Sequence, residues 1–329
     1  MNFYIAKFIE KVTRLTGLLM QPDLNRQNTA VCAANSQIPD ITYANKLGDS
    51  HVSQELEKTM LNEQFHLEYH PQFEIHRGRL IGFEALLRLD SGLFRYDPAE
   101  KFVPLMEENQ MIYQAWARVF DTVCRQRREW HDSGVLAPDC RIAIKLSAGL
   151  LLDDKLYPLI NKILKQYRLS ATMLELQIPQ NILKECSQYL REQLRQLHDC
   201  GFRLTVNDFD TDYPSLASLI QFHVDILRLD KKIIHHISAN PKFNTYVSVV
   251  IKLAHRLGMK IIGEGVETGA QLSILRQLGC DYVQGHLFSR SLLPEELTDF
   301  VLWWRSADSE QRGWNISGAM VYKRSNDSC

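Results

Sequence analysis

The stretch Lys260-Ile261-Ile262-Gly263-Glu264-Gly265-Val266-Glu267-Thr268 decides the fold, because it predicts a short strand between two helices. Helix-like segments precede it at Phe243–Leu257 and follow it at Gly269–Leu278, and a glycine stands after each of them as the expected helix stop. Another β-rich run follows at Tyr282–Gly285. This alternation is typical of a parallel sheet that helices cover on both faces.

The same pattern extends outward along the chain. Eight β-rich runs occur at Phe65–Phe73, Leu80–Leu89, Arg141–Ser147, Met173–Ile178, Arg203–Asp208, Val224–Asp230, Lys260–Val266 and Tyr282–Gly285. From the third run onward the gaps carry helix-like segments, which adds Asp154–Tyr167, Lys184–His198 and Pro294–Trp304. Eight such strands over about 240 residues predict an α/β fold, a TIM-like (β/α)8 barrel. Only the short stretch Glu74 to Arg79 joins the first two runs, so we expect one antiparallel strand.

The regions that flank the barrel differ from it in pattern. We divide the chain into an N-terminal amphipathic helix and linker (1–52), a barrel (53–305) and a flexible C-terminal tail (306–329). Within residues 3–20, apolar side chains such as Ile5, Ile9 and Val12 recur at helical spacing. This helical extension packs on its own domain, binds a partner or a second copy of the chain, or touches a membrane surface.

Composition favours a globular protein of a reducing compartment. The chain is 45% hydrophobic and 23% charged with a net charge of −1, which argues against disorder and against an overall field that attracts nucleic acid. Its seven cysteines form no Cys-x-x-Cys pair, so we expect neither a disulfide framework nor structural zinc. Apolar runs stay short of the ~18 residues that span a bilayer, and no signal-peptide pattern begins the chain. We therefore expect a cytoplasmic protein without a transmembrane segment or direct nucleic-acid binding.

Polar residues stand near the C-terminal ends of seven predicted strands, where barrel enzymes place their chemistry. The set comprises Glu84, Lys145, Gln177, Asn207, Asp208, Arg228, Asp230, Glu264, Glu267 and Gln284. We expect these side chains to share one mouth. The alternative interpretation is that these side chains are ordinary loop residues or form a salt-bridged network. This alternative applies most readily to single members of the set.

Several ordered motifs resemble the EAL family of cyclic-di-GMP phosphodiesterases. They are Phe83–Arg88, Asn207–Tyr213, Ile226–Asp230, Glu264–Thr268 and Gln284–Arg290, within a resemblance that covers about residues 53–305. The resemblance implies a barrel with one antiparallel strand. It also implies hydrolysis of cyclic-di-GMP to the linear dinucleotide by water activated on Mg²⁺ or Mn²⁺, which need hard oxygen ligands.

The positions that hold metal in this family are altered. Glu84 and Asp208 are kept, whereas Lys145, Gln177 and Asn207 replace an Asn, a Glu and an Asp, and Arg228 replaces the catalytic Lys. Because an ammonium only donates hydrogen bonds, Lys145 cannot ligate metal and is expected to pair with Glu84. We therefore predict no metal, no cofactor and no catalytic residue, with Mg or Mn required only by a residual activity. Asp210 and Asp212 replace glycines in a loop that supports the family's dimer, so a homodimer stays open.

Residues that match nucleotide-binding positions of the family are better preserved. Leu86 and Arg88 match positions that touch the dinucleotide and its phosphate, and Asp230, Glu264, Glu267, Gln284, Phe288 and Arg290 are in register. His70 and Ser291 replace a Gln and a Pro, which alters the expected guanine contacts.

Three functions follow from this combination. The first is a catalytically inactive receptor that binds cyclic-di-GMP without metal and passes its state to a protein partner. The second is a nucleotide-independent protein that binds a transcription regulator or a signalling protein. The resemblance implies that either would control bacterial motility, adhesion or virulence gene expression. The third is a residual metal-dependent phosphodiesterase.

Overall fold

The computed structural model describes residues 49–62, 64–90, 94, 98–184, 187–209, 219 and 221–306. The predicted helix at residues 3–20, the loop residues Asp210 and Asp212, and residues 307–329 of the predicted tail lie outside the described residues. The predictions for these segments, and the division into three regions, therefore stay predictions.

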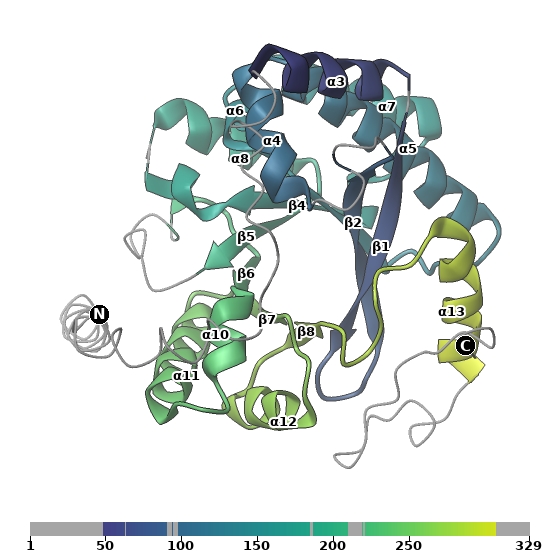
Figure 1. Cartoon of the computed structure of the whole chain (residues 1–329). Helices are drawn as coiled ribbons and strands as arrows, with labels where there is room; N and C mark the ends of the chain where they lie inside the picture. Colours follow the sequence, from purple (N-terminus) through teal and green to yellow (C-terminus); the bar gives the residue numbers. More distant parts are fainter. Residues whose placement is uncertain are drawn as a thin grey trace.

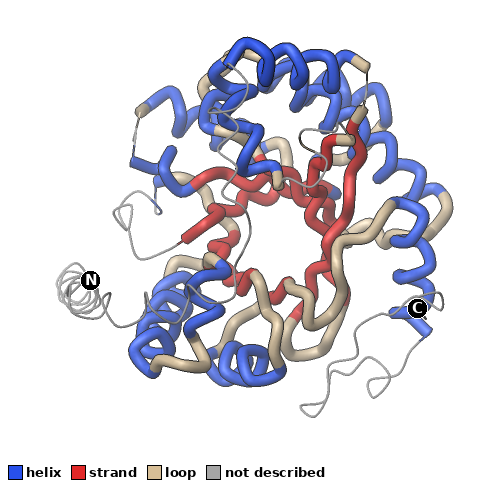
Figure 2. The backbone as a smooth tube through the Cα atoms, viewed as in Figure 1, coloured by secondary structure: helices blue, strands red, loops and turns tan. Residues whose placement is uncertain are grey.

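Eight strands close into a barrel in chain order (Figures 1 and 2). They are β1 (Phe65–Glu74), β2 (Leu80–Leu89), β3 (Arg141–Lys145), β4 (Leu174–Pro179), β5 (Arg203–Phe209), β6 (Ile226–Leu229), β7 (Lys260–Glu264) and β8 (Tyr282–Gln284). Strand β1 runs antiparallel to both of its neighbours, β2 and β8, and every other pair is parallel. The predicted TIM-like barrel with one antiparallel strand is confirmed.

Helices surround the strands as an outer layer (Figure 2). They are α3 (Asp49–Leu61), α4 (Ala99–Glu108), α5 (Ile112–Asp132), α6 (Ala148–Leu151), α7 (Leu156–Tyr167), α8 (Gln188–Asp199), α10 (Lys231–His236), α11 (Pro241–Arg256), α12 (Gly269–Leu278) and α13 (Pro294–Ser306), with 3-10 turns η4 (Ala171–Met173) and η5 (Gln180–Lys184). Gly201, Gly258 and Gly279 follow α8, α11 and α12 with positive φ values of 101°, 81° and 85°, as expected for helix stops. Among the described helices, none has the length and apolar character needed to cross a membrane.

Helices α3, α4 and α5 go beyond the predicted set. α3 begins inside the predicted linker, and α4 and α5 fill the gap between β2 and β3, where helices were not expected. α5 buries Trp116, Phe120 and Val123, whose spacing of four and three residues is a helical signal in the sequence. The expectation that helices fill the gaps only from the third strand onward was therefore incomplete.

Strand β4 illustrates how the barrel positions polar side chains. Leu174, Leu176 and Ile178 are fully buried and alternate with Glu175 and Gln177. Because successive strand residues face opposite sides, the apolar set packs toward the helices and the polar pair faces the barrel interior. Burial of each such aliphatic side chain is worth about 1.5–3 kcal/mol. The outer layer thus stabilises the barrel, while the inner face is available for a site.

Candidate ligand site at the barrel mouth

Arg228 on β6 lies at the centre of a polar cluster inside the mouth, and its side chain is 1% exposed. Its Nη2 donates to Glu84 Oε2 at 2.7 Å, and its Nε donates to Glu264 Oε2 at 2.7 Å. Its Nη1 donates to Gln284 Oε1 at 3.2 Å. One guanidinium therefore neutralises two carboxylates that come from opposite parts of the chain, which offsets the cost of burying these charges.

Glu84 on β2 is the most enclosed carboxylate of this Arg228 cluster, with 2% exposure. Its Oε2 also accepts from Gln284 Nε2 at 2.7 Å. Its Oε1 lies 3.7 Å from Lys145 Nζ and 3.1 Å from the Gln177 amide nitrogen, when that amide is oriented to donate. Burial raises the pKa of Glu84, but Arg228, Lys145 and the Gln284 hydrogen bond outweigh burial and lower the pKa to about 2. Both oxygens of this ionised group are therefore engaged.

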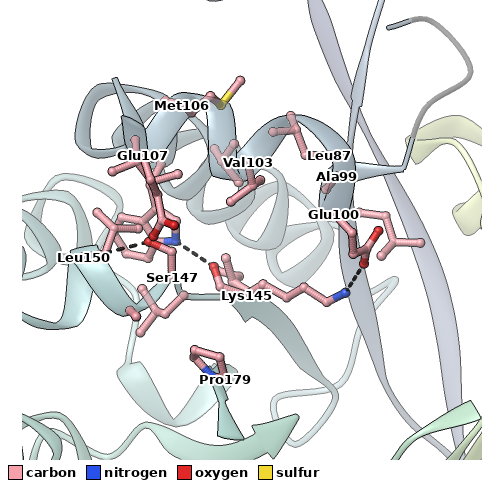
Figure 3. Close-up of a pocket in the computed structure, with 18 of the residues that line it drawn as sticks. Leu87, Ala99, Glu100, Val103, Met106, Glu107, Lys145, Ser147, Leu150 and Pro179 are labelled. Atoms are coloured by element: carbon pink, nitrogen blue, oxygen red, sulfur yellow. Dashed lines mark hydrogen bonds and ion pairs between the residues drawn. The ribbon is translucent and has the colours of Figure 1, made fainter. Parts of the chain in front are cut away.

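Lys145, the last residue of β3, bridges the barrel interior and helix α4. Its Nζ lies 2.9 Å from Glu100 Oε1 and 3.7 Å from Glu84 Oε1, so the predicted pairing with Glu84 is confirmed. Burial lowers the pKa of Lys145, and the two carboxylates reverse this effect and raise it above its ordinary value. The ammonium is thus charged at neutral pH. Figure 3 shows its side chain extended toward Glu100, a partner that the sequence interpretation did not foresee.

The end of β5 carries Asn207 and Asp208, which adopt different environments. Asn207 is buried, with its amide 3.2 Å from that of Gln177. Asp208 is exposed and has a left-handed φ of 55°, a conformation that aspartate tolerates better than most residues. Desolvation raises the pKa of Asp208, with Glu264 and Asp230 adding to the increase while Lys145 opposes it. Of the two polar residues at the end of β5, Asp208 is therefore the one that faces solvent.

The residues present do not fit a divalent metal ion. A hard cation needs several free oxygen ligands, but Glu84 is saturated by a guanidinium, an ammonium and amides. Lys145 and Arg228 place two positive charges within 4 Å of its oxygens. Across the described residues, no three His, Cys, Asp or Glu side chains gather closely enough to hold a metal. The mouth is instead arranged as an internal salt-bridge network.

Four of the predicted nucleotide-binding residues lie in two neighbouring regions. Glu264 and Gln284 belong to the Arg228 cluster, and Leu86 and Arg88 line a neighbouring cavity of about 310 Å³. This cavity lies between the β2–β3 edge and helices α4 and α5, with Val103, Met106, Glu107, Ser147 and Leu150 among its lining (Figure 3). It opens beside Lys145, so the cavity and the mouth share one wall.

The other predicted nucleotide-binding residues make contacts with other parts of the protein. Asp230 caps α10 by accepting from Lys232 N at 2.6 Å. Phe288 is 5% exposed, and its ring centroid lies 5.1 Å from that of Phe73. Arg290 Nη2 donates to Glu296 Oε1 at 2.7 Å, and Glu267 donates its backbone N–H to Gln271 Oε1 at 2.8 Å. These residues lie outside the Arg228 cluster, and their role as nucleotide contacts stays a prediction.

Strand β1 contributes residues that sequence reasoning missed or left undefined. Gln72 is buried and donates to Gln284 Oε1 at 2.9 Å, behind the Arg228 cluster. His70 lies opposite Glu84 in the β1–β2 register, with Nε2 3.1 Å from the Ser289 carbonyl oxygen. Burial lowers the pKa of His70 to about 4, because the favourable charge of Glu84 is countered by His286 and Arg228. The alternation of polar residues along β1 is the signal that could have found this face.

Comparison with known proteins agrees with this geometry. Residues 53–291 match the EAL domain. The signaling protein YkoW of Bacillus subtilis is 33% identical over 247 residues, which are 75% of this chain and 30% of that protein. Cyclic di-GMP phosphodiesterase NbdA of Pseudomonas aeruginosa is 32% identical over 250 residues, 76% of this chain and 32% of that protein. This chain thus spans about a third of the length of these relatives.

Solved structures of EAL domains share the barrel. The PaMucR phosphodiesterase, solved as a complex with c-di-GMP, has 31% sequence identity and a TM-score of 0.71, and the match covers 75% of this chain and 99% of that one. The EAL domain of FimX from Xanthomonas citri, at 20% identity and a TM-score of 0.67, shares the fold over 75% of this chain and 95% of its own. The chain, with its closed barrel and its polar mouth, belongs to the EAL domain family.

Proposed function

We propose that this EAL domain binds cyclic di-GMP at its barrel mouth without a divalent metal and does not hydrolyse it, so that it acts as a regulatory receptor. The Arg228 cluster carries the proposal, because its guanidinium already neutralises Glu84 and Glu264. The PaMucR phosphodiesterase, which shares the fold and 31% of the sequence, was solved with c-di-GMP, and this supports the choice of ligand.

The energy needed to admit a metal supports the absence of hydrolysis. A divalent ion would have to take Glu84 from Arg228, and separating one partner from a buried ion pair costs about 3–5 kcal/mol. Each of the two resident cations would also repel the divalent ion, by ~2–8 kcal/mol at about 4 Å, which is twice the value for two unit charges. Without the ion, water would lack the metal activation on which the family's hydrolysis depends.

Cations at the rim support binding of a phosphodiester. Arg88 is 26% exposed and Lys145 is 39% exposed, so both can reach a ligand that enters the mouth. Charged donors form strong hydrogen bonds to phosphate oxygens, and arginine does so with two parallel bonds. The cavity beside Leu86 offers apolar surface to a base of the same ligand.

Calorimetric titration with cyclic di-GMP in the presence of EDTA tests binding, and chromatography after incubation with Mg²⁺ or Mn²⁺ tests hydrolysis. We expect binding that is unaffected by EDTA, lost in Arg88→Ala and retained in Arg79→Ala, which alters an exposed arginine far from the mouth. We expect no linear dinucleotide. If no heat is measured at high micromolar nucleotide, the receptor proposal is wrong. If the wild type hydrolyses the nucleotide and the Glu84→Gln variant does not, the protein is an enzyme.

A nucleotide-independent regulator is the second candidate. It is favoured by the internal pairing of the mouth, where Arg88 contacts Glu68, Lys145 contacts Glu100, and Arg228 contacts Glu84. Such a protein would act through a partner, for example a transcription regulator, and would give no heat with the nucleotide. For either candidate we propose a cytoplasmic location and control of motility, adhesion or virulence genes, with a homodimer as a further possibility to be tested by light scattering.

A further inference from the structure

Glu68 of β1 lies beside Arg88 at the rim of the mouth. The antiparallel register pairs His66 with Arg88 and Glu68 with Leu86, so Glu68 and Arg88 are diagonal neighbours on one face. Arg88 Nε donates to Glu68 Oε2 at 3.0 Å, and the two side chains are 26% and 23% exposed. This rim arginine, to which the proposed function assigns a phosphate contact, is therefore already paired with a carboxylate.

Ser291 fixes this carboxylate in place. Leu292 pairs with Tyr69 of β1 through two backbone hydrogen bonds of 2.7 and 2.9 Å, which sets Ser291 next to Glu68. Ser291 Oγ donates to Glu68 Oε2 at 2.6 Å, the same oxygen that accepts from Arg88. Because one oxygen accepts both bonds, the carboxylate is oriented toward the arginine from two sides.

We infer that Glu68 is a built-in anionic competitor for Arg88, and that it sets the concentration of phosphodiester ligand to which this protein responds. The inference rests on the proposed function. A phosphate that approaches Arg88 must displace the carboxylate and is repelled by its charge, so the pair lowers affinity. Replacement by glutamine keeps the size of the side chain and an acceptor for Ser291 while it removes the charge.

The test is calorimetric titration of the full chain with cyclic di-GMP in EDTA, for wild type, Glu68→Gln and Glu74→Gln. Glu74 is a matched control on the same strand, with the same 23% exposure and an ion pair of 3.2 Å to Arg79, at the opposite end of β1. We expect Glu68→Gln to bind about fivefold tighter, the upper range for a partly exposed charge pair, and Glu74→Gln to match wild type. High salt should reduce the difference in affinity between wild type and Glu68→Gln, since it screens the charge of Glu68.

The outcomes separate this inference from the proposed function. Equal affinity of wild type and Glu68→Gln overturns the inference and leaves the receptor intact. Absence of binding by every variant overturns the receptor, and the inference with it. Binding by Glu68→Gln alone supports both, because it means that the carboxylate blocks the site. Glu68→Asn, whose shorter side chain does not reach Arg88, gives the same comparison if the glutamine variant fails to fold.

Discussion

Replacement of Arg228 by methionine tests the idea that the mouth is held together by an internal cation. The substitution keeps an unbranched side chain but removes the charge that pairs with Glu84 and Glu264. Glu84 is 2% exposed and would keep only Lys145 and amide donors, whereas Glu264 is 26% exposed and can turn to water. Since removal of one partner from a buried pair costs about 3–5 kcal/mol, and the Glu264 pair adds little, we expect a loss of ~3 kcal/mol in the free energy of unfolding.

Urea unfolding followed by tryptophan fluorescence measures this loss. With a dependence of roughly 3 kcal/mol per molar urea for a chain of this size, the midpoint should fall by about 1 M. Arg79→Met is the matched control, because Arg79 also contacts two carboxylates, Glu74 and Asp139, but is 58% exposed. The Arg79→Met variant should lose less than about 1 kcal/mol in the free energy of unfolding, as is typical of surface ion pairs.

The double variant Glu84→Gln with Arg228→Met gives the decisive comparison. If the cost of Arg228→Met comes from a stranded carboxylate, removal of that carboxylate should recover most of the stability, which a double-mutant cycle reports as coupling. A midpoint for Arg228→Met within error of wild type, or a double variant no more stable than the single one, would refute the claim that Arg228 compensates a buried charge.

Two further predictions concern acid and metal. His70 has a pKa of about 4 in the folded protein, against 6.5 for an ordinary histidine. Between these two pH values the unfolded chain binds a proton at His70 more readily than the folded chain does. The stability that neutral His70 contributes is therefore present above pH 6.5 and is lost as the pH falls toward 4. Urea titrations should show about 2 kcal/mol of loss from pH 7 to 5, and His70→Gln should remove it; an unchanged slope would contradict this. Combined replacement of Lys145 by Asn, Gln177 by Glu, Asn207 by Asp and Arg228 by Lys should create Mn²⁺ binding measurable by calorimetry, absent when Arg228 is kept. If the wild type binds Mn²⁺ as tightly as the combined variant, the argument that the side chains at the mouth exclude a metal ion is wrong.

The sequence predicts the strands well because their signals are local. The run Leu80–Leu89 predicts β2 at its observed limits, since apolar residues fill it and a turn and a charged residue bound it. Helix α4 is harder to predict, because Pro104 lies within it and Pro98 stands before it. Its existence depends on packing of Phe102 and Met106 in the core rather than on a strong local pattern.

Gathering of the polar residues follows from topology, but their pairing does not. Parallel strands bring their C-terminal ends to one rim, which is why Glu84, Arg228 and Glu264 meet as predicted. The contact between Lys145 and Glu100 depends on where α4 lies over the mouth, which no periodicity specifies. The Glu68–Arg88 pair could not be predicted from the short turn between β1 and β2, because a bulge at Gln72 and Phe73 shifts the register by one residue between the turn and the pair.

Charge balance explains why the changes at the mouth belong together. A barrel that holds a metal can bury several carboxylates because the ion neutralises them, whereas a barrel without one must supply the cation from its own side chains. Here Gln177 and Asn207 carry no charge, and Arg228 serves the buried Glu84. Glu84 therefore has a structural role, because its removal would deprive the buried guanidinium of one of its two paired carboxylates. A single change toward a metal site, such as Asn207→Asp, places a negative charge at a buried position. The desolvation of that charge is expected to lower stability while Arg228 and Lys145 stay paired with Glu84.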